Sequence, residues 1–399
     1  MIVSLENNLA RPDTLQLAQW PSEAPLARPA TQANVVHVTQ CLSEGPMAFV
    51  LRVIATLDEL GFRQTLVHTA GPGCSAPELD GLRRVSFVDV PQRSNRVTHA
   101  RTLGRVVRRL VSDEHPTTVH VHAVGPGLTE RMLLAGLPRS SARLFTPHAM
   151  PLLNPRRPLM RSLHRALERL AGLLPITPVG RGVGEAQTLA RAWRRPAFVL
   201  EQPIDDCYFA VEPRPAEPPV ILCVGRPTDY NAPELFAQLA LRFEIDELPA
   251  RFVWVGDGDA GREARLRAAG VEVTRHLGNA EMAAMLGQAT VYLQTSVWEG
   301  MPVSLMSAMA AGLPCVVADV TSHRDVVTHG KSGFIVRDID DFDRHLRWLL
   351  DEPELRRRLG ESARRECRQR FAGERFRAAL QHLYGGQRVM RSAPTRIEA

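Results

Sequence analysis

The stretch VWEGMPVSLMSAMAAGLPCVVA, residues 297–318, contains three patterns in order: a turn-like segment, a helix-like segment and a final apolar run. It follows the apolar run Val291–Gln294, which has the length and composition of a buried strand. The pattern predicts a turn at 299–302, a helix at 303–311 and a second strand at Cys315–Ala318. Strand, helix and strand in this order are typical of a parallel sheet covered by helices.

The same alternation extends through the rest of the chain. In the second half we expect strands at 220–224, 252–255 and 271–274, and two final helices at 340–350 and 354–371. In the first half we expect a helix at 47–60 and strands at 35–38, 65–68, 85–90, 118–122, 144–146, 176–177 and 198–200. We therefore predict an α/β protein with two Rossmann-like, doubly wound parallel-sheet domains that face each other across a cleft.

Proline-rich segments set the expected domain boundaries. Residues 203–219 hold five prolines and are expected to be a linker. Residues 1–33 lack periodicity and are expected to be an N-terminal extension. The predicted domains are 34–202 and 220–371, followed by a helix and tail at 372–399 that we expect to pack back on the first domain.

Composition narrows the class of protein. The 399 residues are 44% hydrophobic and 23% charged, as in globular proteins, and the net charge is +6. No apolar run reaches the about 18 residues of a membrane span, and the N-terminus does not resemble a secretory signal, so a cytoplasmic location is expected. The positive charge favours anionic partners such as nucleotide phosphates or phospholipids, with no nucleic acid expected. The six cysteines form no C-x-x-C pair, so no cysteine-based metal site is expected.

Glu299 and His148 are the candidate catalytic residues. A helix that begins beside Gly300 offers free backbone N–H groups to an oxyanion, and the Glu299 carboxylate can accept hydrogen bonds from sugar hydroxyls. Capping of the helix by Glu299 is the alternative. His148 ends a predicted strand, where active-site groups gather, and a structural role is equally open for it.

Two further motifs allow other interpretations. Residues 256–261, GDGDAG, match G-x-G-x-x-G after a predicted strand, which leaves a dinucleotide-dependent dehydrogenase as a minor alternative. His120 and His122 are expected to point to opposite faces of their strand, so we do not expect them to share a metal ion.

With these motifs in place, residues 297–314 resemble the EGxPxxLxEAMAxGxP signature of the retaining GT-B glycosyltransferases of family 4, also called glycosyl transferases group 1. The resemblance continues through 329–336 (HGKSGFIV), 224–226, 255–258 and 277–279. It is weaker in the first half, at 43–46, 146–148 and 202–205. Altogether it covers about residues 35 to 385.

The resemblance implies transfer of a sugar from a nucleotide-sugar such as a UDP- or GDP-sugar, with retained configuration, no cofactor and no essential metal. Arg226 would pair with the donor diphosphate, Glu299 would contact the donor sugar, and His148 would lie near the reacting sugar. Gly45 would let a first-domain loop approach the diphosphate. The donor-binding residues implied in this way are Gly45, Gly225, Arg226, Asn231, Gly278, Gly300, Met301, Pro302, Leu305 and Ser307.

Two positions depart from the family pattern. Ser307 stands where the family has a second glutamate that holds the donor ribose, and Asn231 stands where it has a lysine for the diphosphate. Exchange of a charge-assisted hydrogen bond for a neutral one is expected to weaken donor binding by roughly tenfold.

We therefore predict a hexosyltransferase of bacterial polysaccharide or cell-envelope biosynthesis, acting on a glycan or lipid-linked acceptor. A catalytically silent or altered-donor nucleotide-sugar-binding protein and a nucleotide-sugar epimerase are the alternatives. Arginines and leucines at near-helical spacing also predict a basic amphipathic helix that touches the inner face of the plasma membrane, with a plain solvated face as the alternative. They are Arg156, Arg157, Arg161, Arg165, Arg169, Leu159, Leu163, Leu167 and Leu170.

Overall fold

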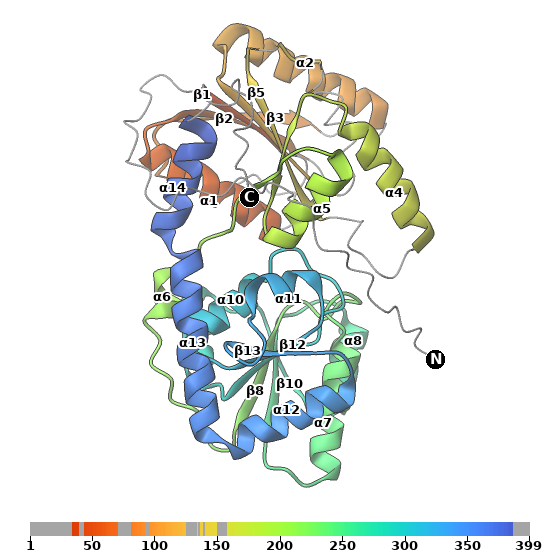
Figure 1. Cartoon of the computed structure of the whole chain (residues 1–399), viewed down its shortest axis with the longest axis vertical. Helices are drawn as coiled ribbons and strands as arrows, with labels where there is room; N and C mark the ends of the chain where they lie inside the picture. The colour runs from red at the N-terminus through yellow and green to blue at the C-terminus, as the bar shows by residue number, and fades with distance from the viewer. Residues whose placement is uncertain are drawn as a thin grey trace, which may run out of the picture.

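The computed structural model describes residues 34–39, 44–70, 81–91, 96–124, 134, 136–138, 140–149 and 158–385. The expected extension at 1–33, the end of the tail and the arginines at 156 and 157 lie outside the described residues. Within them the chain forms two α/β domains stacked one above the other (Figure 1). The predicted fold class is confirmed.

The first domain contains a seven-stranded sheet of order β3-β2-β1-β4-β5-β6-β7, in which all the described pairings are parallel. The inner strands β1, β4 and β5 are buried on both faces, as expected of a parallel sheet covered by helices, and the edge strand β3 is largely exposed. The elements are β1 (Asn34–Thr39), α1 (Glu44–Glu59), β2 (Arg63–Ala70), β3 (Val85–Pro91), α2 (Arg96–Glu114), β4 (Thr118–Val124), β5 (Ala142–Ala149), α4 (Pro158–Ala171), β6 (Thr177–Gly180), α5 (Val183–Trp193) and β7 (Phe198–Val199).

The second domain repeats the plan with a six-stranded parallel sheet of order β10-β9-β8-β11-β12-β13. The elements are α6 (Asp206–Phe209), β8 (Val220–Val224), α7 (Pro233–Ile245), β9 (Arg251–Val255), α8 (Ala260–Ala268), β10 (Glu272–Thr274), α9 (Asn279–Gln288), β11 (Val291–Gln294), α10 (Val303–Ala310), β12 (Cys315–Ala318), α11 (Thr321–Val326), β13 (Gly333–Val336), α12 (Ile339–Asp351) and α13 (Pro353–Phe371). Strand β13 was not predicted.

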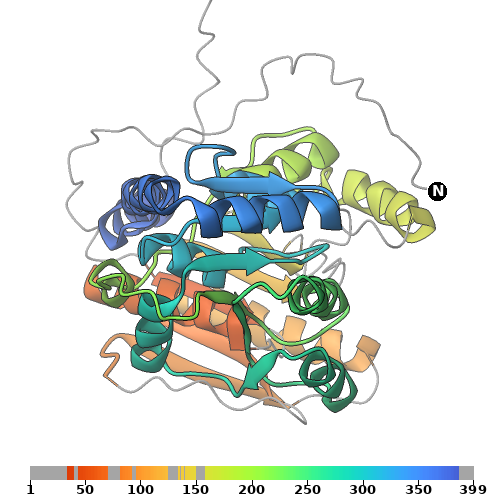
Figure 2. The same cartoon turned by 90° about the horizontal axis from the view of Figure 1, so that it is seen from below.

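The chain crosses between the domains twice, at neighbouring points. The first crossing follows β7 and the second follows α13. The two crossing segments are hydrogen-bonded to each other, because the Ile204 amide donates to the Phe371 carbonyl oxygen (3.0 Å). Helix α14 (Gly373–Gly385) then packs on the first domain, with Phe376 and Leu380 in one apolar cluster with Phe49 of α1. Helices α13 and α14 therefore run along one edge of the molecule and span both domains (Figures 1 and 2).

The proline-rich segment between the domains is more ordered than a plain linker. It carries α6, whose Tyr208 and Phe209 are buried in the core of the second domain together with Val211. That core also holds most of α10, whose residues 305–310 are all buried. The segment that begins with Glu299 is therefore attached to a rigid, fully packed helix.

Candidate active site

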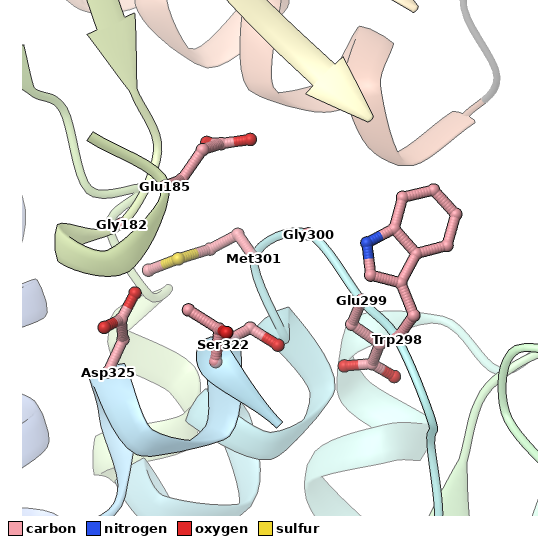
Figure 3. A pocket seen from close by; sticks show the side chains of 9 residues that line it. Gly182, Glu185, Trp298, Glu299, Gly300, Met301, Ser322 and Asp325 are labelled. Carbon is pink, nitrogen blue, oxygen red and sulfur yellow. The ribbon is translucent and has the colours of Figure 1, made fainter. Parts of the chain in front are cut away.

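A pocket lies between the two domains and holds about 360 Å³ of space, part of it open to solvent. The second domain supplies the loop before α10 and the start of α11, and the first domain supplies the start of α5 (Figure 3). The lining residues are Gly182, Glu185, Trp298, Glu299, Gly300, Met301, Thr321, Ser322 and Asp325. The loop that the sequence singled out thus faces the other domain.

Glu299 is held by a buried polar network at the end of β11. Its Oε1 accepts hydrogen bonds from Gln294 Nε2 (2.7 Å) and Ser296 Oγ (2.6 Å). Gln294 is itself fixed, because its Oε1 accepts from the Tyr292 hydroxyl. In Figure 3 the Glu299 carboxylate points away from the Trp298 ring, into the second domain. Such anchoring fixes the carboxylate in one orientation beside the pocket.

The capping role for Glu299 is not what the structure shows. Helix α10 has Pro302 at its N-cap, with no side-chain hydrogen bond. The second carboxylate oxygen, Glu299 Oε2, is buried without a hydrogen bond, and His323 Nε2 lies 3.5 Å away. His323 Nδ1 donates to the Ala318 carbonyl oxygen (2.7 Å), which fixes the ring with Nε2 toward Glu299.

Arg181 lies between His148 and the Gly300 backbone at the domain interface. Its Nη2 donates to the His148 carbonyl oxygen (2.8 Å), and a Cβ added at Gly300 would lie 2.2 Å from the same Nη2. Arg181 is 6% exposed and pairs with Glu185, whose Oε2 accepts from the Arg181 backbone N–H (2.6 Å). Burial lowers the pKa of Arg181 and raises that of Glu185. Only a glycine at 300 allows this close approach.

His148 ends β5 with its side chain buried. Its Nε2 lies 3.4 Å from His122 Nδ1, and its Nδ1 has no hydrogen-bond partner. Burial, followed by the nearby charge of Arg181 and by His122, lowers the pKa of His148 well below its usual value. The imidazole is therefore neutral at physiological pH, and it is not among the residues that line the pocket.

A second interdomain contact is made by Asp325 of α11. Its carboxylate accepts from the Gly184 backbone N–H of α5, at 3.0 Å to Oδ1 and 2.8 Å to Oδ2. Burial raises the pKa of Asp325 to about 6, and the nearby carboxylates of Glu201 and Glu185 add to this, against the effects of the Gly184 N–H and of Arg370. The second domain is thereby attached to the first beside the pocket.

Arg226 and Asn231 lie together in the loop after β8. The Arg226 side chain is exposed, and its carbonyl oxygen accepts from Asn231 Nδ2 (2.7 Å). Asn231 Oδ1 lies 3.2 Å from Ser296 Oγ, so this loop and the Glu299 network are joined through one serine. A Cβ added at Gly225 would lie 3.0 Å from Asn231 Nδ2, which explains the small residue there. Asn231 thus shapes the loop that presents Arg226.

The remaining predicted donor-binding residues occupy varied positions. Leu305 is buried in the core, and the Ser307 hydroxyl donates to the Val303 carbonyl oxygen of its own helix (3.0 Å). Gly278 is the N-cap of α9, and Gly45 is exposed in the first turn of α1. Among the described residues, no hydrogen bond or ion pair joins Gly45 or Gly278 to Glu299 or Arg226.

The G-x-G-x-x-G motif has a packing explanation. Gly256 has φ +130°, and a Cβ there would lie 2.6 Å from the Gly225 carbonyl oxygen. The loop ends at a nine-residue helix, α8, capped by Asp259, which accepts from the Arg262 N–H. The motif lets two loops of the second domain approach each other and needs no dinucleotide to account for it.

The expectation for His120 and His122 was wrong. One residue separates them, so they share a face of β4, and their ring centroids are 4.0 Å apart. Sequence analysis also missed Arg181, Gln294, Ser296 and His323. Arg181, Gln294 and Ser296 lie at or just after strand ends and His323 lies in α11, but only the folded chain shows which of them contacts Glu299 or His148.

Comparison with known proteins places these observations in a family context. The family model described as "Glycosyl transferases group 1" matches residues 206–366. The chain is 28% identical over 233 residues to a sulfoquinovosyl transferase of Arabidopsis thaliana, covering 54% of this chain and 44% of the relative. It is 28% identical over 145 residues to UDP-Gal:alpha-D-GlcNAc-diphosphoundecaprenol alpha-1,3-galactosyltransferase of Escherichia coli, covering 34% of this chain and 38% of that protein. The chain thus spans less than half the length of these relatives.

The fold is shared over a longer stretch. The structure of sucrose-phosphate synthase from Thermosynechococcus elongatus superposes with a TM-score of 0.73, at 14% identity, covering 90% of this chain and 100% of the other. Identity at this level shows the fold alone. The architecture of this chain is therefore GT-B.

Proposed function

We propose that this chain is an enzyme that transfers a hexose from a nucleotide-sugar to a glycan or lipid-linked acceptor, because its residues 206–366 match the family model of the glycosyl transferases group 1. One observation carries the proposal most strongly. The loop of Glu299 and Gly300 lies in a pocket between the domains and closes directly on Arg181 and His148 of the other domain. Donor and acceptor bound on opposite domains would meet there.

Arg226 and the start of α10 would hold the donor diphosphate. A guanidinium can pair with two phosphate oxygens and neutralise the leaving group, which is why we propose a reaction that needs no metal. The free N–H groups at the start of α10 add partial positive charge on the same side of the cleft. Asn231 supports this arrangement by fixing the backbone at Arg226.

Glu299 would act at the donor sugar. In the proposed step the bond between the anomeric carbon and the phosphate oxygen breaks, and its electron pair leaves with the nucleoside diphosphate. The acceptor oxygen bonds to the anomeric carbon on the same face, and its proton passes to the departing phosphate. Positive charge develops on the sugar meanwhile, and the anchored Glu299 carboxylate stabilises it or holds a sugar hydroxyl. Neutral His148 would exchange a hydrogen bond with a sugar hydroxyl.

The name of the Escherichia coli relative guides the choice of substrates. That protein takes UDP-Gal and a diphosphoundecaprenol-linked sugar, so a UDP-hexose and a polyprenyl-diphosphate-linked acceptor are the first pair to test. Its name, like that of the sulfoquinovosyl transferase, favours transfer over epimerisation. No helix of the described residues is both long and apolar enough to cross a membrane.

Helix α4 would bring the enzyme to its lipid-linked acceptor. Arg165 and Arg169 are exposed, and Leu170 and the following Leu173 are 61% and 78% exposed. Exposed leucines beside arginines fit an anionic bilayer surface better than bulk water. We propose that this end of α4 touches the membrane peripherally.

A donor panel tests the proposed function. Wild type is incubated with UDP- and GDP-hexoses and a polyprenyl-diphosphate N-acetylglucosamine acceptor, and both nucleotide release and the acceptor mass are measured. We expect one donor to give an acceptor heavier by one hexose residue. Glu299→Gln should lower this rate at least about a hundredfold, because it removes a charge that acts in the transition state.

The exposed Glu354 of α13, which pairs only with Arg357 of its own helix in the contacts described, provides the control. Glu354→Gln should retain wild-type turnover. If no donor is consumed by wild type above the rate without enzyme, the protein is a silent binder and the proposal fails.

A further inference from the structure

Three histidines form a compact, buried cluster inside the first domain. His37 lies on β1, and His120 and His122 lie on the neighbouring β4, with His37 directly paired to His120. All three are 0% exposed. One ring nitrogen from each can be chosen so that all lie within 4.8 Å of one another. Three imidazoles therefore converge on one point under the sheet.

Two ring nitrogens of this cluster lack hydrogen bonds. They are His37 Nδ1 and His122 Nε2, both buried. Each of these rings is held by its other nitrogen instead: His37 Nε2 lies 3.2 Å from Gln64 Oε1, and His122 Nδ1 lies 3.4 Å from His148 Nε2. A buried polar atom without a hydrogen-bond partner destabilises the folded state, so two such atoms in one cluster point to a missing ligand.

The outer contacts determine where the lone pair of His37 points. Gln64 Nε2 donates to the Ile54 carbonyl oxygen (3.0 Å), so Gln64 Oε1 is the atom that faces His37. An amide oxygen only accepts, which puts the proton of His37 on Nε2 and leaves a lone pair on Nδ1. Metal-binding histidines are typically oriented in this way, with the outer N–H on a carbonyl or carboxylate.

His120 provides the third imidazole. Its Nδ1 is hydrogen-bonded to the Tyr384 hydroxyl of α14, and its Nε2 lies 2.9 Å from Thr146 Oγ1. A metal ion bound to one of these nitrogens would replace the hydrogen bond made there, and the other hydroxyl would remain as the partner of the second nitrogen. Tyr384 also lies beside His37, with ring centroids 6.1 Å apart.

The chemistry of the three side chains limits which metal ion the cluster suits. Within the described part of the chain, the grouped ligands are imidazoles alone, which suit Zn²⁺ rather than Mg²⁺ or Ca²⁺.

We propose that His37, His120 and His122 bind a divalent transition-metal ion, Zn²⁺ in the first instance, inside the first domain. The site is structural, since none of the three histidines is among the residues that line the interdomain pocket. The ion would join β1, β4 and, through Tyr384, α14. It would also fix the tautomer of His122 and thereby of His148. The proposal stands independently of the proposed transferase activity.

Metal analysis of tag-free protein tests the site, because a polyhistidine tag would itself bind zinc. Protein purified from zinc-supplemented medium is expected to contain about one Zn²⁺ per chain after desalting. X-ray absorption at the zinc edge should show imidazole nitrogens at about 2.0–2.1 Å. Metal-free wild type after incubation with Zn²⁺ would overturn the proposal, as would a spectrum without imidazole ligands.

Variants locate the ion. His37→Gln and His122→Gln should each lower the bound zinc at least about tenfold, the usual effect of disturbing a metal site. His276→Gln, on an exposed histidine of the second domain, should retain the wild-type amount. Full zinc content in both cluster variants would place the metal elsewhere and refute the assignment. The absorption spectrum of wild type decides the question even if a variant does not fold.

Discussion

Gly300→Ala tests the contact on which the interdomain pocket depends. The added methyl would lie 2.2 Å from Arg181 Nη2 and 3.2 Å from its Cζ. Optimal contacts between heavy atoms are about 3.5–4.0 Å, so the guanidinium must move by more than about 1 Å or the domains must separate. Either change breaks the hydrogen bond from Arg181 to the His148 carbonyl oxygen.

The cost follows from the kind of bond that is lost. A hydrogen bond of a charged group contributes about 1.5–3 kcal/mol, which corresponds to about a 10- to 150-fold change in an equilibrium or rate. We expect kcat/KM for nucleotide release to fall by this factor in Gly300→Ala. Thermal stability should change less than activity, because Gly300 itself is exposed. Gly373→Ala, at a position where a Cβ meets nothing within 4 Å, is the matched control.

A double-mutant cycle shows whether Arg181 is the partner of the clash. In an Arg181→Ala background the methyl has nothing to displace, so adding Gly300→Ala should cost less than about 0.5 kcal/mol, the limit for independent sites. Equal losses from Gly300→Ala in both backgrounds would refute the reasoning, as would full activity of Gly300→Ala in the wild-type background.

The other predictions concern pH, the membrane and the donor ribose. Burial raises the pKa of Asp325 to about 6, so the folded state holds that proton more tightly than the unfolded state and loses stability as pH rises from about 4 through 6. Asp325→Asn should therefore raise the melting temperature at pH 7.5 and leave it nearly unchanged at pH 4. Melting temperatures of wild type and variant that run in parallel over this pH range would contradict the prediction. Leu170→Ser with Leu173→Ser should abolish co-flotation with anionic liposomes, and failure of wild type to float would exclude the membrane contact. Ser307 is only 5% exposed, so a glutamate at 307 must turn toward the cleft to stay solvated. Ser307→Glu should then tighten UDP-sugar binding by about tenfold in isothermal titration, and unchanged affinity with a lowered melting temperature would mean that this position does not reach the donor.

Strand periodicity predicted most of the fold because most of the short apolar runs are buried in a parallel sheet. Strand β13 was not predicted because its four residues, GFIV, begin with glycine and follow a polar turn. Helix α6 was not predicted because it is one turn long and lies inside a proline-rich segment. Contacts of Tyr208 and Phe209 with α10 and α9 stabilise it, and the local sequence pattern does not indicate them.

The candidate site was only partly predictable for a similar reason. Glu299 and His148 could be identified because each follows a strand at the edge where ligands bind. Gln294 and Ser296 look like ordinary polar residues in the sequence, and their role depends on the distances of 2.7 Å and 2.6 Å to Glu299. Arg181 contacts the loop of the other domain, and no local sequence pattern predicts a contact between domains.

A crystal structure with bound UDP tests the central claim most directly, namely that the nucleotide-sugar binds to the second domain beside the pocket between the domains. The account predicts that the diphosphate lies against the Arg226 side chain and the N-terminus of α10, with the terminal phosphate toward Glu299. A nucleotide bound only to the first domain, or absent from the crystal at saturating UDP, would contradict it.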